Sequence, residues 1–277
     1  MLSQQNLHTC RERHRILLQT NEFICLLPHP HLSAYISNYS ITFPTKDIMP
    51  DNFTAIPCGC ATLSVERDDK GLSIHLDGPT AKPYMYGSQV NLLRMVVTIE
   101  FNPAGLYALT GINQNELADE SLPFEAVNPK LSKSLSETVE KAHSVAELAT
   151  DLDKLLLRHM YTAHHPQLLL SLQHILGSAG NVSVKKLADD IHYSERQLNR
   201  IFKQHVGIST KSFSKLVRIN KTFRLLKKPN IGTAFISDVM GFHDLSHFIR
   251  DFKSVCGVTP GEYRNNMSDF YINTSKF

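Results

Sequence analysis

The sequence predicts an α+β protein with two domains, a strand-rich N-terminal half and an all-helical C-terminal half. Short segments typical of strands fill the region from residue 39 to residue 100, whereas helical periodicity dominates after residue 129. A segment of the helical half also repeats about fifty residues further on. At 277 residues, the chain is long enough for two such domains.

The charge of the chain is divided unevenly between these halves. Residues 1–165 carry 13 Lys and Arg against 18 Asp and Glu, whereas residues 166–277 carry 16 against 8. This asymmetry indicates that only the C-terminal half binds a polyanion. No run approaches the roughly 18 apolar residues of a membrane span, and the N-terminus lacks the apolar core of a secretory signal. The five cysteines are odd in number and scattered, which suits a reducing cytoplasm.

The N-terminal half begins with a polar arm that has a weak strand or helix signal near residues 16–18. Apolar residues at 32, 35, 36 and 39 then follow at near-helical spacing. An Asp-Asp-Lys-Gly sequence at 68–71 is a hairpin signal between two of the predicted strands. These strands are expected at residues 40–43, 61–66, 72–76 and 95–100.

Three helices are predicted between residues 129 and 177. The first has apolar residues at 131, 135, 139 and 142, and Ser144 with Glu147 forms a capping box that opens the second. Pro166 is suited to the first turn of the third, which ends near Gly177. The apolar faces of these helices either pack on the strand domain or pair two subunits. We place the domain boundary between residues 165 and 180, which gives an N-terminal domain at 1–165, a helix end and linker at 166–180, and a C-terminal domain at 181–277.

The internal repeat has the pattern of two helix-turn-helix units. In the first unit Ser194 and Gln197 form a capping box, and Gly207 can end the second helix. In the second unit Gly241 makes the turn and Asp244 is the predicted N-cap. An amphipathic helix, predicted from residue 210 to residue 228, joins them. The residues that recur fifty positions later are Arg200, Phe202, Lys203, Gly207, Ile208, Ser209 and Phe213, which return as Arg250, Phe252, Lys253, Gly257, Val258, Thr259 and Tyr263.

The second copy carries a specific run of residues. It comprises Gly241-Phe242-His243-Asp244, Ser246-His247-Phe248, Arg250, Phe252-Lys253, Gly257, Thr259-Pro260 and Tyr263-Arg264. This run, with the first copy, resembles the DNA-binding domain of the AraC/XylS family of bacterial transcription regulators. The resemblance implies two helix-turn-helix units joined by a long helix, both reading one face of DNA. The sequence departs from the family at His192, where Gly is usual, at Thr210, where Pro is common, and at Ser237, where Ala is usual.

The resemblance also implies which residues meet DNA. Arginine is the commonest reader of guanine, and asparagine suits adenine. Lysines at the edge of a reading helix more often touch phosphates. For Arg250, the alternative is a structural ion pair with an acidic neighbour. The predicted base contacts are Arg196, Asn199, Arg200, Leu245, Ser246, His247, Ile249 and Arg250, and the predicted phosphate contacts are Lys203, Lys211 and Lys253.

The N-terminal half resembles, less specifically, the small β-barrel sensor domains that precede such DNA-binding domains. The similar run extends from Thr98 through Gly111 to Leu122-Pro123-Phe124. The expected fold is therefore a small β-barrel-like domain with flanking helices, followed by an all-α DNA-binding domain.

Other chemistry is poorly supported by the sequence. Cys58-Gly59-Cys60 lacks the four ligands and the spacing of a zinc site, and the histidine pairs at 29 and 31 and at 164 and 165 have no ligand pattern. No phosphate-binding loop or nucleophile–base set stands out, so we expect neither an enzyme nor a metal or other cofactor.

We therefore expect a cytoplasmic, nucleoid-associated regulator that binds double-stranded DNA, and no membrane association. Its N-terminal domain would sense a small-molecule effector, form a homodimer, or do both, and RNA polymerase is a partner by family resemblance. The alternative is a ligand-independent regulator with a protein-interaction module. A more distant alternative is a metal-dependent or Ada-like DNA-repair protein, although the spaced cysteines of the latter are absent.

Overall fold

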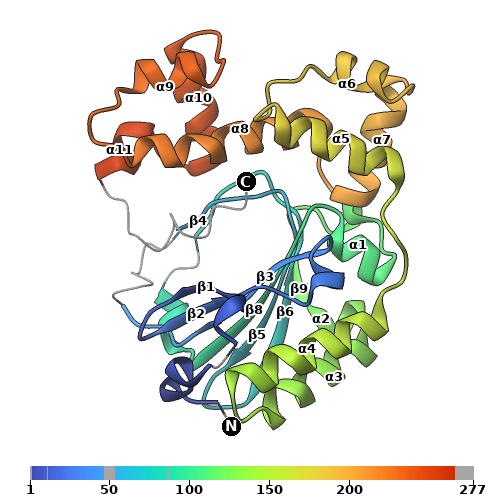
Figure 1. Cartoon of the computed structure of the whole chain (residues 1–277), viewed down its shortest axis with the longest axis vertical. Coiled ribbons are helices and arrows are strands. Elements are labelled where there is room, and N and C mark those ends of the chain that lie inside the picture. Colours follow the sequence, from blue (N-terminus) through green and yellow to red (C-terminus); the bar gives the residue numbers. More distant parts are fainter. Residues whose placement is uncertain (1, 11, 47–53, 86–87, 266–277) are drawn as a thin grey trace.

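The computed structural model describes residues 2–10, 12–46, 54–85 and 88–265 (Figure 1). A strand-rich N-terminal part is followed by an all-helical C-terminal part, which confirms the α+β class. The predicted C-terminal domain runs on to residue 277, but residues 266–277 lie outside the described part.

Seven strands form one antiparallel sheet in the order β1-β2-β3-β8-β5-β6-β9. The sheet is curved, and β1 and β9 are its two edge strands (Figure 1). The barrel-like shape therefore comes from the curvature of the sheet and not from pairing of β1 with β9. A separate ribbon pairs β4 (Thr54–Ala55) with β7 (Tyr84–Met85). The sheet strands are β1 (Ile16–Gln19), β2 (Phe23–Leu26), β3 (Ile36–Thr42), β5 (Thr62–Arg67), β6 (Leu72–Asp77), β8 (Met95–Phe101) and β9 (Ser121–Pro123).

The predictions for residues 61–66, 72–76 and 95–100 are confirmed by β5, β6 and β8. The weak signal at 16–18 is the strand β1. The near-helical spacing from residue 32 to residue 39 was misleading. Only a 3-10 turn ends at Leu32, and strand β3 begins at Ile36 rather than at the predicted residue 40. Because β3 lies inside the sheet with most of its residues buried on both faces, it lacks the alternation that marks a half-exposed strand.

The predicted hairpin turn joins β5 and β6. Asp68 Oδ1 accepts hydrogen bonds from the backbone N–H groups of Lys70, at 2.7 Å, and Gly71, at 2.9 Å. Gly71 has φ +150°, a backbone conformation that side chains disfavour, so the glycine is required by the turn.

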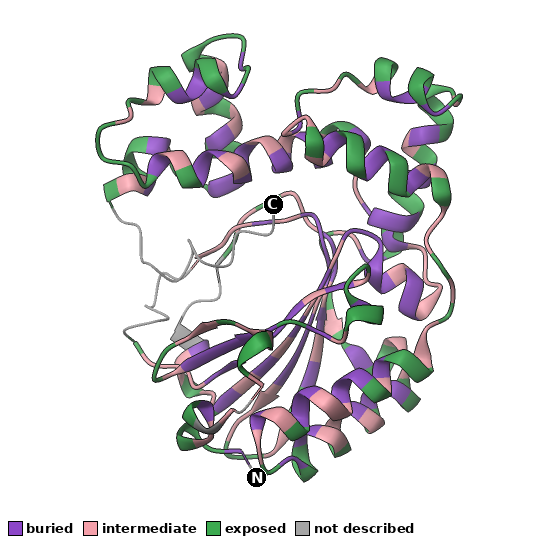
Figure 2. Cartoon of the chain, in the orientation of Figure 1, coloured by how far each residue is buried: buried purple, intermediate pink, exposed green. Residues whose placement is uncertain are grey.

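Helices α3 (Pro129–Lys141) and α4 (Val145–His159) pack on one face of the sheet (Figure 2). Their apolar residues, such as Leu135 and Leu152, join Val65 and Val97 of the sheet in one core. The apolar faces predicted for these helices are therefore used within the chain. Ser144 caps α4 as predicted, but the Glu147 carboxylate accepts from the backbone N–H of His143 at 2.8 Å. The remaining N-terminal helices are α1 (Gly105–Thr110), α2 (Phe124–Val127), and the 3-10 helices η1 (Gln4–Thr9), η2 (Arg13–Arg15), η3 (Pro30–Leu32), η4 (Ser88–Leu92) and η5 (Gln114–Glu116).

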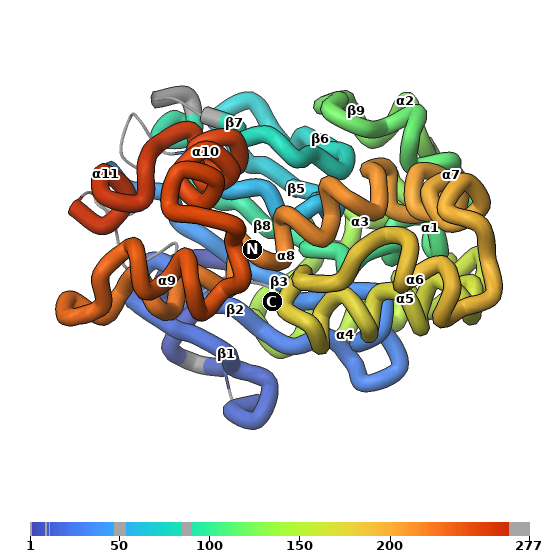
Figure 3. The backbone as a smooth tube through the Cα atoms, turned by 90° about the horizontal axis from the view of Figure 1, so that it is seen from above, coloured from blue at the N-terminus to red at the C-terminus, as the bar shows by residue number. Residues whose placement is uncertain are grey.

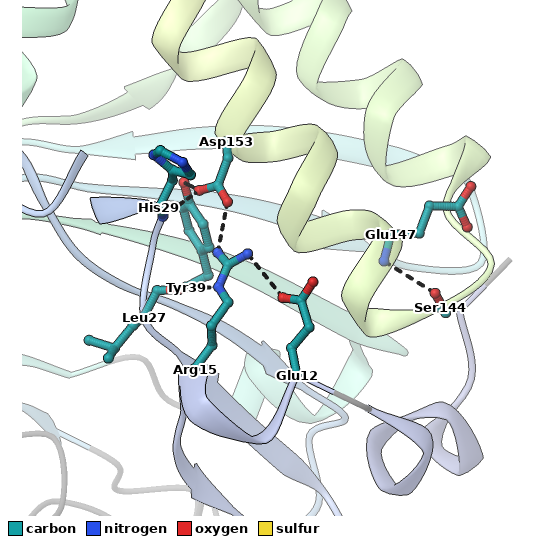
Figure 4. A network of polar contacts seen from close by, with 8 residues as sticks. All are labelled: Glu12, Arg15, Leu27, His29, Tyr39, Ser144, Glu147 and Asp153. Atoms are coloured by element: carbon teal, nitrogen blue, oxygen red, sulfur yellow. Dashed lines mark hydrogen bonds and ion pairs between the residues drawn. The ribbon is translucent and has the colours of Figure 1, made fainter. Parts of the chain in front are cut away.

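A buried ion pair fastens the start of the chain to α4 (Figure 4). Arg15 Nη2 lies 2.8 Å from Asp153 Oδ2. Asp153 Oδ1 accepts from the Tyr39 hydroxyl at 3.0 Å and from the His29 backbone N–H at 2.9 Å. Arg15 also donates to the carbonyl of Leu27 at 2.8 Å. One carboxylate therefore holds three separate segments in place.

The C-terminal helices form two groups joined by α8, as the view from above shows (Figure 3). Helices α5, α6 and α7 pack around the first half of α8, and α9, α10 and α11 pack around its second half. The α5 residues Leu168, Leu172 and Ile175 belong to the core of the first group. The helices are α5 (Pro166–Gly177), α6 (Val184–Asp190), α7 (Glu195–Val206), α8 (Thr210–Leu226), α9 (Thr233–Val239), α10 (Leu245–Cys256) and α11 (Pro260–Asn265).

The N-terminal part contacts α8 through the loop that contains Cys58 and Cys60. A Cβ built on Gly59, which has φ +68°, would lie 2.8 Å from Ile208 Cδ1 and 2.9 Å from Leu216 Cδ1. Asn220 Nδ2 of α8 donates to the Pro57 carbonyl at 3.3 Å. The loop thus approaches α8 as closely as a residue without a side chain allows.

Candidate nucleic-acid interface

The first helix-turn-helix unit consists of α6 and α7. Ser194 Oγ accepts from the backbone N–H of Gln197 at 3.2 Å, and Gln197 Oε1 accepts from the backbone N–H of Ser194 at 2.9 Å. This confirms the predicted capping box. Gly207 ends α7 with φ +88°, as expected for a left-handed C-cap. His192, which replaces the usual glycine, makes the turn with φ +58°.

The second unit consists of α9 and α10 and repeats this design. Gly241, at the position equivalent to His192, has φ +68°, so both turns use the same left-handed conformation. Asp244 Oδ1 accepts from the backbone N–H of His247 at 2.6 Å, and Gly257 ends α10 with φ +77°. The predicted turn, N-cap and C-cap are all present.

Equivalent positions of α7 and α10 form matching exposed faces. Arg196, Arg200 and Lys203 are exposed on α7, and their spacing of four and three residues places them along one side of the helix. Ser246, Arg250 and Lys253 occupy the same three positions of α10 and are exposed as well. Each unit therefore presents a polar face with basic groups, while its apolar residues lie in the core.

Other predicted contact residues have structural partners. Asn199 is half-buried, and its Oδ1 accepts from the backbone N–H of Thr210 at 3.2 Å, at the start of α8. His247 Nε2 lies 3.2 Å from Asp251 Oδ2, and its ring packs edge-on against Phe242. Asn199 and His247 therefore make contacts within the domain, although both lie beside the exposed faces.

The remaining predicted residues lie at or near the surface. Leu245 is 37% exposed at the start of α10, whereas Ile249 is half-buried. Arg250 is exposed on α10, and no carboxylate of the described residues lies within 4.0 Å of its guanidinium. Lys211 is exposed in the first turn of α8.

The end of α7 opposite the predicted base contacts packs on the N-terminal part. The His205 ring lies 4.0 Å from the Tyr107 ring of α1 and 6.0 Å from that of His165, centroid to centroid. Burial, followed by the positive charges that His165 and His164 can carry, lowers the pKa of His205 to about 4. His205 is therefore neutral near pH 7, and α7 is in direct contact with the domain that precedes it.

A cavity of about 300 Å³ lies between the β4–β7 ribbon and the sheet. Ile56, Pro57 and Tyr84 form apolar parts of its wall. Its charged groups include Asp77, and also Lys82 with Asp119, whose Nζ and Oδ2 atoms lie 2.6 Å apart. The described residues show no cluster of three or more side chains placed to hold a metal ion. No helix in the described ranges is long and apolar enough to cross a bilayer.

Two family models match the sequence. Residues 187–266 match a family described as a helix-turn-helix domain, and residues 25–123 match a family described as a domain of unknown function. The first match begins within α6 and includes α7, α8 and the second helix-turn-helix unit. The second covers most of the sheet and gives no activity for the N-terminal part.

Most of the curated relatives match about a third of this chain. The arabinose operon regulatory protein of Escherichia coli is 28% identical over 156 residues, which cover 51% of this chain and 53% of that protein. An uncharacterized HTH-type transcriptional regulator of Bacillus subtilis, YfiF, is 34% identical over 92 residues, which cover 31% of this chain and 29% of that protein. The chain thus spans about a third of the length of most of these relatives. It spans about half of the length of the arabinose operon regulatory protein.

Solved structures give a weaker likeness. The C-terminal domain of AraT, a response regulator from Geobacillus stearothermophilus, is 26% identical with a TM-score of 0.35, over 38% of this chain and 90% of that one. ToxT from Vibrio cholerae is 16% identical with a TM-score of 0.42, over 78% of this chain and 95% of that one. The assignment therefore rests on the sequence matches and on the paired helix-turn-helix units. The C-terminal region is therefore similar to the helix-turn-helix DNA-binding domain of AraC/XylS-type transcription regulators.

Proposed function

We propose that the protein is a sequence-specific regulator that inserts α7 and α10 into successive major-groove segments of one face of DNA. The observation that carries this proposal is the equivalence of the two exposed faces, with Arg200 matched by Arg250 and Lys203 by Lys253. Reading helices of paired units meet DNA about one helical turn, or ~34 Å, apart. The C-terminal charge excess of 16 Lys and Arg over 8 Asp and Glu supplies the attraction to phosphate.

The exposed faces of α7 and α10 would contribute unequally to base recognition. Arg196, Asn199 and Arg200 offer three hydrogen-bonding groups to base edges, whereas Leu245 and Ile249 of α10 offer apolar contacts, alongside Ser246, His247 and Arg250. A bidentate base contact contributes roughly 1–3 kcal/mol of discrimination, more than we expect from contact with a thymine methyl group. The first unit would therefore set most of the sequence preference. Phosphate contacts from Lys203, Lys211 and Lys253 would add affinity and register.

Binding of the full chain to a randomised duplex library tests these roles. Arg200→Ala is expected to relax base preference at one or two positions, whereas Lys253→Ala lowers affinity evenly across sequences. Should Leu245→Ala or Ile249→Ala remove more base preference than Arg196→Ala and Arg200→Ala, the ranking of the two helices is reversed.

For the N-terminal part we propose a sensor that binds a small molecule, pairs two subunits, or does both. The cavity of about 300 Å³ supports the first role, because it combines an apolar wall with a few charged groups. Thermal unfolding of the full chain against a panel of small polar metabolites tests it. If none stabilises the protein, the alternative of a ligand-independent protein-interaction module is favoured.

The proposed domain division stays at residues 165 and 181, although α5 packs with the first helix-turn-helix unit. RNA polymerase is the expected protein partner of a regulator of this family. Its DNA target would place the protein with the nucleoid in the cytoplasm. No cofactor or catalytic activity is proposed.

A further inference from the structure

The segment of residues 178–181 contacts both α8 and the second helix-turn-helix unit. It connects α5 to α6, so it precedes the first unit in the sequence. In space, its residue Asn181 contacts Met240, 59 residues further along the chain. The two units are therefore linked by more than the helix that joins them.

Gly180 brings this segment against the backbone of α8. Its φ is +77°, and a Cβ built there would lie 2.2 Å from the carbonyl oxygen of Ser214 and 3.0 Å from the backbone nitrogen of Arg218. No side chain fits at that distance, so the approach requires glycine. The Gly180 carbonyl accepts a hydrogen bond from Arg218 Nη2 at 2.8 Å.

The same Arg218 side chain reaches the turn of the second unit. Its guanidinium carbon lies 5.2 Å from the centre of the Phe242 ring, within the range of a cation–π contact. Phe242 packs in turn on His247 and Phe248 of α10, with ring centres 5.8 Å and 4.9 Å away. The planar guanidinium thus bridges the segment before α6 and the aromatic cluster that supports α10.

Asn181 makes a second bridge beside the first. Its Nδ2 donates to the carbonyl of Met240 at 2.9 Å. Its amide also lies close to Gly241, where a built Cβ would be 3.0 Å from Oδ1. Asn181, which precedes the first unit in the sequence, therefore contacts the left-handed turn of the second unit.

We propose that Arg218, supported by Gly180 and Asn181, is a positioning residue that fixes the relative orientation of α7 and α10 and so restricts recognition to half-sites at one separation. The inference rests on the proposed function, in which both helices read DNA. Without the contacts of Arg218 and Asn181, the main connection between the units would be α8 and the short turns at its ends. Small changes of their orientation would then let the reading helices fit other separations.

The test uses the full chain and duplexes that carry the two half-sites selected by the wild type from a random library. The separation of the half-sites is then changed in single base-pair steps up to half a helical turn. The measured quantity is the ratio of affinities at the selected and the altered separations. The variants are Arg218→Met, Asn181→Ala and, as a matched control, Arg224→Met, which removes an exposed arginine of the same helix.

For the wild type we expect a steep loss of affinity when the half-sites are moved to opposite faces of the duplex. Arg218→Met should reduce the ratio roughly tenfold, the typical effect of losing one charge-assisted hydrogen bond. Asn181→Ala should reduce it less, in the same direction. Arg224→Met should lower affinity by a similar factor at every separation and leave the ratio unchanged.

A folded Arg218→Met protein with the wild-type ratio would overturn the inference. If that variant does not fold, Arg218→Lys, which keeps the charge but not the planar fork, and Asn181→Ala carry the same comparison. Wild-type ratios in both of these would also overturn it. A wild type that is itself indifferent to separation would instead refute reading by two helices, and the inference would fall with the proposed function.

Discussion

Replacing Asp153 with alanine should destabilise the N-terminal part more than most single changes, because this buried carboxylate has three partners that are buried or half-buried (Figure 4). The Asp153 side chain is only 6% exposed and that of Arg15 only 11%. Removal of the Asp153 carboxylate leaves three donors without this acceptor: the mostly buried Arg15 guanidinium, the Tyr39 hydroxyl and the His29 backbone N–H. Breaking a buried ion pair by removing one partner costs about 3–5 kcal/mol.

The lower end of this range is the better expectation here. Arg15 keeps Glu12, 3.2 Å away, and the Leu27 carbonyl, 2.8 Å away, after the change. A loss of about 3 kcal/mol corresponds to a fall in Tm of roughly 6–12 °C for a protein of this size. Tyr39→Phe should cost only about 1 kcal/mol, since it removes one hydrogen bond. Burial and then the Asp153 carboxylate raise the pKa of Tyr39, so its hydroxyl remains a donor in alkaline solution.

Urea unfolding followed by circular dichroism measures these losses. Asp151→Ala is the matched control, because Asp151 lies on the same helix and forms an exposed ion pair with Lys154 at 2.9 Å. Such a pair contributes less than about 1 kcal/mol. If Asp153→Ala costs no more than Asp151→Ala, the network does not fasten the start of the chain to α4.

Further predictions concern the contact between the two parts and the DNA face. Since the pKa of His205 is lowered to about 4 from its usual 6.5, its contribution to stability should be full above pH 6.5 and lost as the pH falls toward 4. After allowance for solvent screening, the free energy of unfolding should fall by about 1–2 kcal/mol over this range. The urea midpoint should therefore decrease with falling pH, and it should depend less on pH in the His205→Gln variant. Gly59→Ala should destabilise by about 1–3 kcal/mol, because φ is +68° and Ile208 and Leu216 crowd the site. Hydrogen exchange should then rise in α8, and unchanged protection there would refute the close contact. Lys253→Ala should reduce the slope of log affinity against log salt by about 0.9, and an unchanged slope would show that this lysine does not contact phosphate.

Local features of the helical half could be predicted from the sequence because each depends on neighbours in the chain. The capping box at Ser194 and Gln197 needs two polar side chains three residues apart. The left-handed ends at Gly207 and Gly257 need glycine. His192 shows the limit of this reasoning, because it departs from the glycine that is usual in the family and yet adopts the same left-handed conformation, with φ +58°.

Contacts between distant segments could not be predicted in this way. Arg15 and Asp153 give no local sign that they pair. The amphipathic pattern of its helix gives no sign that Arg218 is half-buried between Gly180 and Phe242. Asn199 was predicted only as a base contact, although its side chain also caps α8. Each of these roles arises from packing of elements whose relative positions periodicity does not specify.

The most direct test of the central claim is hydroxyl-radical footprinting of the full chain on a duplex selected from a random library. Reading by α7 and α10 predicts two protected segments on one face of the DNA, with their centres about one helical turn, or ~10 base pairs, apart. Arg200→Ala should weaken protection of one segment, and Arg250→Ala protection of the other. A single protected segment, or two that both depend on Arg200 alone, would contradict recognition of DNA by both helix-turn-helix units.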